Sequence, residues 1–153
     1  MKVETDSFYV YFFYDSKDRL LYIGKTTSVR ARMKQHFSRL CVENEPWKNL
    51  VDKDKITLYK CNNPTDLDIY EVFFINKYKP LYNKDRVFGY TPSFELPELT
   101  PIKPMKTTKI LLRLFNEEMD DYFRESFVAR FSQSIDEDFC SYNRETNRLE
   151  ICF

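Results

Sequence analysis

FYVYFFYDSKDRLLYIG, residues 8–24, is the stretch around which the predicted fold is built. Residues 8–14 are all aromatic or β-branched, a composition that favours a strand buried on both faces. DSKDR, residues 15–19, is a polar turn, and residues 20–23 fit a returning strand that ends at Gly24. The stretch therefore predicts a β-hairpin.

Two helices and a third strand are predicted after the hairpin. Residues 26–28 offer helix N-caps, and apolar residues then recur at helical spacing at Val29, Met33, Phe37 and Leu40. After a polar connection with room for a short helical turn, residues 55–61 alternate like a strand. Residues 66–78 form a long apolar helix. This order predicts an α+β fold in which helices flank a mainly antiparallel sheet.

The remaining residues predict a linker and an appendage. Residues 91–106 contain four prolines and fit an extended linker between a domain of residues 1–90 and a C-terminal accessory region of residues 107–153. In that region residues 109–115 (KILLRLF) predict a strand, 116–132 a helix, and 139–153 a hairpin turning near 145–147. Such a βαββ unit is marginal alone, so we expect it to pack on the first domain or on a copy of itself.

Charge is unevenly distributed although the net charge is zero. Residues 1–90 carry 16 Lys and Arg against 12 Asp and Glu, and residues 91–153 carry 8 against 12. Between Lys25 and Arg39 there are five cations and no carboxylate. The sequence therefore predicts a local positive field rather than a global one.

The cysteines and hydropathy predict the compartment. The four cysteines form no CxxC pair and no metal-ligand spacing with the single histidine, which favours reduced thiols. Cys140 and Cys152 are symmetric about the expected turn and would pack against each other as thiols. Since there is no signal peptide and no apolar run of about 18 residues, we expect a soluble, intracellular protein of the cytoplasm, with the nucleoid or nucleus as alternatives.

The helix after Gly24 has two interpretations. Arg32, His36 and Arg39 would line one edge of its apolar stripe, and Arg30 and Lys34 the other. They could be ordinary cations bordering an amphipathic helix, with His36 packed in the core. Alternatively they form a ridge that faces phosphate, because a guanidinium can donate two hydrogen bonds to phosphate oxygens and a histidine can relay a proton.

A carboxylate and several tyrosines also have two interpretations each. Glu71 lies among apolar residues, so it is either a structural ion pair or a ligand for a hard cation such as Mg²⁺. Tyr9 and Tyr11 share one face of the first strand, and Tyr22 ends the second. These phenols either fill the core or orient or deprotonate a water molecule.

The spacing of these residues resembles the GIY-YIG nuclease family over about residues 8–85. Tyr9-Val10-Tyr11 is followed after ten residues by Tyr22-Ile23-Gly24, which is similar to the family signature. Arg32 lies ten residues after Tyr22 and His36 four further on, and Glu71 opens EVFFINKYKPLYN, which ends at Asn83. The first glycine of GIY is Tyr9 here, a change expected to alter packing more than chemistry.

The resemblance implies a three-stranded antiparallel sheet flanked by helices and one divalent metal, Mg²⁺ or Mn²⁺, held by Glu71. Tyr11 and Tyr22 would position or deprotonate the attacking water, Arg32 would bind the scissile phosphate, and His36 would assist proton movement. The residues expected to contact the substrate more generally are Lys25, Arg30, Lys34, Arg39 and Asn83. Of these, Asn83 fits a structural brace better than a reacting group.

We therefore expect a metal-dependent endonuclease that hydrolyses DNA phosphodiesters, with RNA as an alternative substrate. A catalytically silent nucleic-acid-binding module and a partner-binding protein on the same scaffold are the competing hypotheses. Because residues 91–153 are acidic, we expect the C-terminal region to serve self-association as a homodimer or contact with a protein partner rather than DNA binding.

Overall fold

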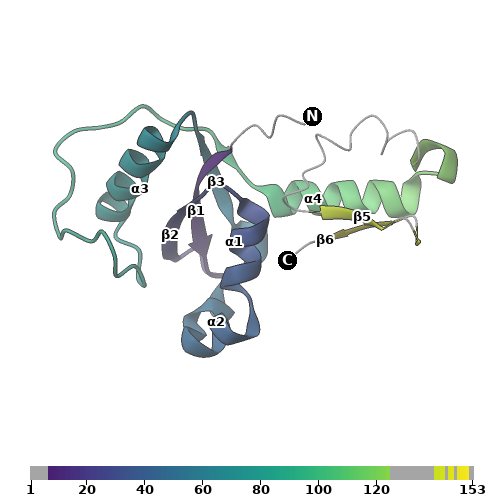
Figure 1. The fold of residues 1–153 in the computed structure, drawn as a ribbon, viewed down its shortest axis with the longest axis horizontal. Helices are drawn as coiled ribbons and strands as arrows, with labels where there is room; N and C mark the ends of the chain where they lie inside the picture. The colour runs from purple at the N-terminus through teal and green to yellow at the C-terminus, as the bar shows by residue number, and fades with distance from the viewer. Residues whose placement is uncertain (1–6, 125–139, 144, 147, 152–153) are drawn as a thin grey trace.

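The computed structural model describes residues 7–124, 140–143, 145–146 and 148–151. Its main sheet is antiparallel, with strand order β2-β1-β3-β4. The strands are β1 (Phe8–Tyr14), β2 (Leu20–Thr26), β3 (Thr57–Cys61) and β4 (Pro101–Ile102). Helix α3 (Pro64–Tyr78) lies on one side of this sheet and α1 (Val29–His36) on the other (Figure 1). The expected α+β class is confirmed, with β4 as a short fourth strand.

Strand β1 is buried on both faces, as its composition predicts. Val10 and Phe12 belong to the apolar cluster shared with α3, whereas Tyr11 and Phe13 belong to the cluster shared with α1. Tyr9 packs against the same cluster as Tyr11, so these two tyrosines share a face. The alternation follows from the two-residue period of a strand that has a helix on each side.

Strand β2 is longer than expected. It continues through Gly24 to Thr26, which pairs with Tyr9 of β1, so the prediction that the strand ends at Gly24 is wrong. Gly24 lies directly opposite Tyr11 in the register. A Cβ at position 24 would lie 2.2 Å from the Tyr11 hydroxyl oxygen, so the glycine makes room for the tyrosine ring rather than ending the strand.

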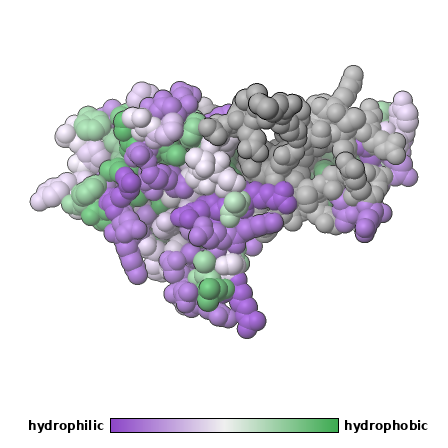
Figure 2. Space-filling view, in the orientation of Figure 1, coloured by the Kyte–Doolittle hydropathy of each residue, from purple (hydrophilic) through white to green (hydrophobic). Residues whose placement is uncertain are grey.

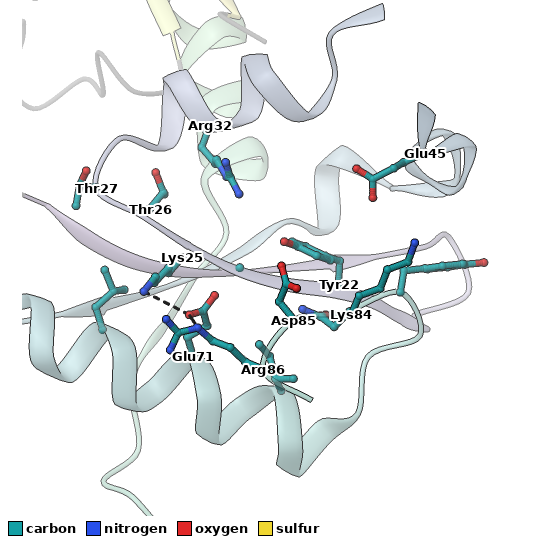
Figure 3. Close-up of a pocket in the computed structure, with 15 residues that line it drawn as sticks. Tyr22, Lys25, Thr26, Thr27, Arg32, Glu45, Glu71, Lys84, Asp85 and Arg86 are labelled. Carbon is teal, nitrogen blue, oxygen red and sulfur yellow. Dashed lines mark ion pairs between the residues drawn. The ribbon is translucent and has the colours of Figure 1, made fainter. Parts of the chain in front are cut away.

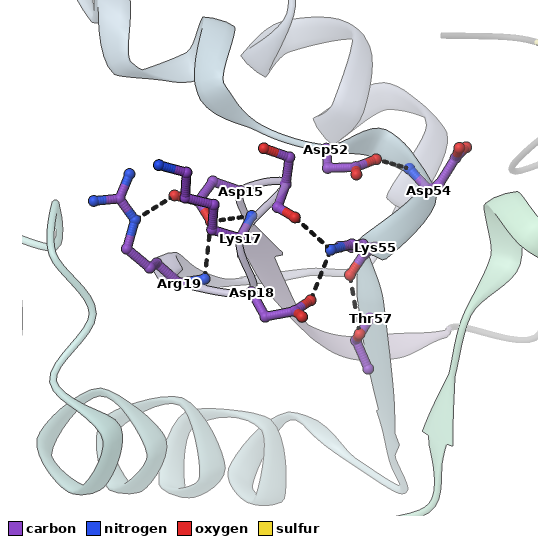
Figure 4. Close-up of polar contacts among 9 residues, drawn as sticks. Asp15, Lys17, Asp18, Arg19, Asp52, Asp54, Lys55 and Thr57 are labelled. Atoms are coloured by element: carbon purple, nitrogen blue, oxygen red, sulfur yellow. Dashed lines mark hydrogen bonds and ion pairs between the residues drawn. The ribbon is translucent and has the colours of Figure 1, made fainter.

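The turn between β1 and β2 is fixed by buried and surface polar contacts (Figure 4). The Asp15 carboxylate, which is 4% exposed, accepts hydrogen bonds from the backbone N–H groups of Lys17 and Arg19, each 2.9 Å long. Burial alone would raise the pKa of Asp15, but these bonds and the Arg19 guanidinium lower it below its usual value. Lys55 Nζ donates to Asp18 Oδ1 at 2.8 Å and so ties the turn to the segment before β3.

The helix after β2 is shorter than its apolar stripe predicts. Helix α1 ends at His36, and a second helix, α2 (Arg39–Asn44), begins after a break. The Ser38 side chain accepts a hydrogen bond from the backbone N–H of Cys41, so it caps a new helix. As a result Leu40, expected on the buried stripe, is 68% exposed, and Arg39 is not on one ridge with His36.

Two short 3₁₀ helices, η1 (Pro46–Leu50) and η2 (Lys53–Lys55), occupy the connection to β3. Helix α3 then begins two residues earlier than predicted, because the Asn63 side chain accepts from the backbone N–H of Asp66 and Pro64 takes the first turn. It ends at Tyr78, as predicted, where Lys79 adopts a left-handed conformation with φ of 50° before Pro80.

The segment predicted as an extended linker makes specific contacts with the first domain. Residues 91–100 have no regular secondary structure, but Leu96 and Leu99 pack against the α3 cluster and the Tyr70 hydroxyl donates to the carbonyl of Pro97 at 2.7 Å. Pro101 and Ile102 then pair with β3. The division of the chain into domains stays a prediction.

Beyond β4 the predicted strand over residues 109–115 is wrong. Helix α4 (Pro104–Arg113) and a π-helical turn, η3 (Leu114–Glu118), occupy this region. The apolar residues at 110, 111, 114 and 115 recur four residues apart, a helical period that outweighs the β propensity of the segment.

The helix predicted over 116–132 is interrupted. Met119 has extended backbone angles, and the Asp120 side chain accepts from the backbone N–H of Phe123 to start a new turn. Residues 125–132 lie outside the described part of the chain.

The C-terminal hairpin is confirmed, with β5 (Cys140–Asn143) antiparallel to β6 (Arg148–Ile151). Its register places Ile151 opposite Cys140, whereas Cys152 lies outside the described residues. Helix α4 packs against η2, where Lys109 Nζ lies 2.6 Å from Asp54 Oδ1. Of the two packing modes expected for this region, the structure therefore contains the one against the first domain.

Candidate active site

A polar cavity of about 600 Å³ lies between α1, β2 and α3. Arg32 enters it from α1, Tyr22 and Lys25 from β2, Glu71 from α3, and Arg86 from the segment after α3 (Figure 3). Arg32 and Glu71 lie on opposite walls. The fold thus brings one carboxylate, one phenol and several cations from distant parts of the sequence into one space.

Tyr11, Arg32 and His36 form a hydrogen-bond chain beneath the cavity. Arg32 Nε donates to the Tyr11 hydroxyl oxygen at 3.1 Å, and this oxygen lies 2.6 Å from His36 Nε2. An arginine only donates, so the phenol oxygen accepts from Arg32. Between Tyr11 and His36 the donor depends on the imidazole tautomer, and a phenol that donates to an unprotonated Nε2 uses both its proton and a lone pair.

Burial controls the protonation of these hydrogen-bonded side chains. His36 is 5% exposed, and its burial, followed by the charges of Lys48 and Arg32, lowers its pKa to about 3. Burial likewise raises the pKa of Tyr11 and of Tyr22 above the usual phenol value. Both tyrosines are therefore protonated at neutral pH in this state. His36 is thus a packed core residue that is hydrogen-bonded to Tyr11 and is absent from the described residues that line the cavity, and its role in proton movement stays a prediction.

Glu71 is a buried carboxylate that lacks a hydrogen bond on one oxygen. Its Oε2 atom is buried without a hydrogen-bond partner, and the nearest cations, Lys25 Nζ and Arg86 Nε, each lie 3.6 Å away. Burial raises the pKa of Glu71, and the two cations offset this only in part. Lys25 is hydrogen-bonded to Asp68 at the surface and is therefore shared between two carboxylates.

A divalent metal fits this carboxylate. In the part of the chain that the structure describes, no three His, Cys, Asp or Glu side chains gather into a metal cluster. Mg²⁺, however, is commonly held by one or two carboxylates, with water and substrate phosphate as its other ligands. The orphaned oxygen of Glu71 in an open polar cavity is the donor that such a site requires.

The predicted phosphate-binding cations are only partly brought together. Lys25 lines the cavity, whereas Arg30, Lys34 and Arg39 are absent from the described residues that line it. Arg39 is 93% exposed and pairs with Glu43 on its own helix. A direct role of these three residues in gripping phosphate stays a prediction.

Asn83 has the geometry of a brace. Its Oδ1 accepts from the backbone N–H of Ile23 at 2.9 Å, and its Nδ2 donates to the Ile23 carbonyl at 2.8 Å. The side chain therefore continues the hydrogen-bonding pattern of a strand along the edge of β2. It holds the segment after α3 next to the cavity.

Three charged residues that were not predicted from the sequence, Lys84, Asp85 and Arg86, line the cavity directly after Asn83. A run of three charged residues after the predicted brace was the signal that could have identified them. Arg86 has a φ of 59°, an uncommon left-handed conformation for a residue other than glycine. In this conformation the Arg86 side chain lies next to the Glu71 carboxylate.

Among the described helices, none combines the length and apolar character that a membrane crossing requires.

Known proteins are similar to this chain in sequence. A family model described as the GIY-YIG catalytic domain matches residues 7–84. The chain is 33% identical over 88 residues to the uncharacterized protein YurQ of Bacillus subtilis (strain 168), covering 57% of this chain and 68% of that protein. It is also 33% identical over 86 residues to UvrABC system protein C of Dictyoglomus thermophilum, covering 54% of this chain and 14% of that protein. No solved structure matches significantly.

Proposed function

This chain belongs to the GIY-YIG family, and from that premise we propose that it is a metal-dependent endonuclease that hydrolyses DNA phosphodiester bonds. One observation carries the proposal. The buried Glu71 oxygen without a hydrogen bond lies across a polar cavity from Arg32. Lys25 and Arg86, 3.6 Å away, compensate the burial of this carboxylate only in part, so a further cation would stabilise it. The guanidinium on the opposite wall suits the phosphate that such a cation would accompany.

Arg32 is the residue proposed to bind the scissile phosphate. Its Nε is held by Tyr11, and its Nη1 donates to Gln35 Oε1 at 2.8 Å. These contacts fix the plane of the guanidinium before the substrate arrives. A group oriented in advance stabilises the charge that develops on phosphate oxygens without having to reorganise.

Tyr22 is the phenol proposed to contact the attacking water. It lines the cavity, whereas Tyr11 is fully buried behind Arg32 and already engaged with His36. We therefore assign Tyr22 to orienting the water and Tyr11 with His36 to positioning Arg32. Lys25 and Arg86, which lie 3.6 Å from Glu71, would turn to the bound phosphate. Mg²⁺ or Mn²⁺ held by Glu71 would supply charge neutralisation at that phosphate.

Cleavage of labelled single-stranded, duplex and branched DNA, and of RNA, with Mg²⁺ or Mn²⁺ tests the proposal. We expect Arg32→Ala to lower the cleavage rate roughly 100-fold or more and Glu71→Gln to abolish metal-dependent cleavage. Arg113→Ala and Glu118→Gln, exposed residues of α4 and η3 that pair with each other, are the matched controls and should cleave normally.

If Arg32→Ala or Glu71→Gln cleaves as well as the parent protein, the site assignment is wrong. DNA binding without cleavage under either metal would instead support a catalytically silent binding module. No affinity for DNA or RNA at low salt would support a partner-binding role on this scaffold.

We also propose that residues 107–153 mediate self-association. The support is their charge, since six Lys and Arg face ten Asp and Glu, a poor composition for gripping DNA. Light scattering on the full chain and on a chain ending at Phe88 tests this proposal. A dimeric full chain and a monomeric shorter chain are expected, and two monomers would rule out self-association.

A further inference from the structure

An apolar groove of about 440 Å³ lies on the outer side of α3, next to the active-site cavity. Its floor is formed by Ile69, Val72 and Phe73 of α3, and its far wall by the aromatic residues of the following segment. That segment presents three exposed rings within seven residues, namely Phe88 at 66%, Tyr90 at 83% and Phe94 at 61% exposure. Figure 2 shows hydrophobic side chains gathered at the end of the molecule where α3 and this segment lie.

The groove wall is held in place by a buried asparagine. Asn76 of α3 is 5% exposed, and its Nδ2 donates to the carbonyls of Val72 at 2.8 Å and Arg86 at 2.9 Å. Its Oδ1 accepts from the backbone N–H of Phe88 at 2.8 Å. The amide thus bonds its own helix at Val72 and fixes the following backbone at Arg86 and Phe88. The exposed rings that follow are therefore carried by an anchored segment.

Arg86 connects the groove to the active-site cavity. It lines both spaces, and its Nε lies 3.6 Å from the Glu71 carboxylate. On the same border Asp68 lines the groove while it is hydrogen-bonded to Lys25, which lines the cavity. A nucleic-acid strand with a phosphate near Arg32 and Glu71 would therefore meet Arg86 next and the aromatic groove beyond it.

We propose that this groove binds an unpaired nucleobase of the substrate strand, with Arg86 contacting the phosphate between that base and the scissile bond. Exposed aromatic rings provide stacking faces for bases of any identity, and an apolar floor provides few groups for reading hydrogen bonds. A cation between an aromatic platform and a phosphate site matches the alternation of base and phosphate along a single strand. The proposal rests on the proposed function and adds a preference for substrates with unpaired bases next to the cleaved bond.

Binding of short fluorescent oligonucleotides to the full chain in EDTA tests the groove without cleavage. The two probes are a single-stranded thymidine oligonucleotide and one of equal length made of abasic sites, which keeps the phosphates and lacks the bases. We expect the thymidine oligonucleotide to bind roughly tenfold more tightly. Tyr90→Ala should abolish this difference, and Tyr90→Trp should retain it because a stacking face is kept.

Tyr122→Ala is the matched control, since Tyr122 is an aromatic residue of the C-terminal region with 78% exposure. It should leave both affinities unchanged. Because Tyr90 is even more exposed, its truncation should not alter the thermal unfolding midpoint. Measuring that midpoint for each variant checks that the variant is folded.

Equal affinity of the parent protein for the two oligonucleotides would overturn the proposal, as would an equal loss in Tyr90→Ala and Tyr122→Ala. If Tyr90→Ala keeps its DNA affinity but turns an oligomer into a monomer, the groove is a protein interface instead. Measuring cleavage and oligonucleotide binding on the same variants separates this proposal from the nuclease proposal. Cleavage without base-dependent binding refutes only the groove, and base-dependent binding without cleavage under either metal refutes only the nuclease.

Discussion

Tyr11 and Gly24 face each other across β1 and β2, and the tyrosine ring packs over the glycine. The Tyr11 ring occupies the space where any side chain at position 24 would begin, since an added Cβ would lie 2.2 Å from its hydroxyl oxygen. The glycine is thus required by the phenol opposite it and not by the end of a strand. The tyrosine and glycine of the family signature are one packing unit in this chain.

We therefore expect Gly24→Ala to destabilise the protein by roughly 1–3 kcal/mol, the usual cost of overpacking a core. The same change in a Tyr11→Ala background should cost less, because the ring that the new methyl group meets is gone. Chemical denaturation of the parent, both single variants and the double variant measures this coupling. Strictly additive effects would show that the contact is not what requires glycine at position 24.

The neutral state of His36 predicts a pH-dependent stability. Its folded-state pKa of about 3 lies below the unfolded value of 6.5, so below pH 6.5 the unfolded chain binds a proton that the folded protein excludes. Stability therefore falls as the pH is lowered, by roughly 2 kcal/mol between pH 7 and pH 5. Glu71 acts in the opposite direction, because its raised pKa lets the folded state keep a proton that the unfolded chain has lost.

The comparison of the parent with His36→Gln separates the two groups, because Glu71 is common to both proteins. Denaturation curves at several pH values from 5 to 7 should show a steeper loss of unfolding free energy in the parent than in the variant. Parallel pH profiles would indicate that burial does not lower the pKa of His36 in the folded protein.

At the scale of elements, the sequence predicted those parts whose signals are local. The bounds of β1 and the end of α3 agree with the structure, since an aromatic run and a helix-ending Pro80 act on their immediate neighbours. The break after α1 was missed because it depends on the Ser38 side chain capping a new helix in the middle of an apolar stripe. Helix α4 was missed because the apolar residues of KILLRLF fit both the two-residue period of a strand and the 3.6-residue period of a helix.

Two asparagines act in the same way on different elements. Asn83 hydrogen-bonds both backbone groups of Ile23 in β2, and Asn116 does the same for Leu149 in β6, at 3.1 and 3.2 Å. In each case a side-chain amide replaces a neighbouring strand at a sheet edge. A loop or helix end is thereby attached to a strand that is distant in sequence.

We expect Asn83→Ala to lower the unfolding free energy by roughly 1–3 kcal/mol, because two part-buried backbone groups of Ile23 lose their partners. It should also slow cleavage, since the same segment carries Arg86 into the cavity. Asn49→Ala, at an exposed position of η1, is the control and should change neither quantity. Unchanged stability of Asn83→Ala in thermal unfolding would argue against the bracing role.

At the scale of the whole molecule, the candidate site was predictable only where residues follow a fixed spacing. Tyr22, Arg32 and Glu71 line one cavity as the family resemblance implies. Arg86 was missed because it approaches Glu71 from a segment with a left-handed backbone that is bonded to Asn76, and neither feature leaves a periodic signal in the sequence. Conversely, Arg39 fitted the helical spacing but lies on a different helix.

The attachment of residues 89–103 to the first domain gives the last prediction. These residues contribute Leu96 and Leu99 to the α3 cluster, a 2.8 Å ion pair between Glu95 and Lys77, and strand β4 along the edge of β3. Partial burial of two leucines and the loss of edge pairing should together amount to roughly 2 kcal/mol or more. In a domain of this size that corresponds to a fall of roughly 10 °C in the unfolding midpoint.

A chain ending at Phe88 should therefore unfold at a lower temperature than a chain ending at Lys103, by about that margin in calorimetry. Neither chain contains α4 or the C-terminal hairpin, so the comparison isolates the segment itself. Equal midpoints would mean that residues 89–103 behave as the extended linker that their prolines predict. The expected difference would instead move the stable boundary of the catalytic domain past the end of its sequence motif, because the outer face of α3 and the free edge of β3 both need covering.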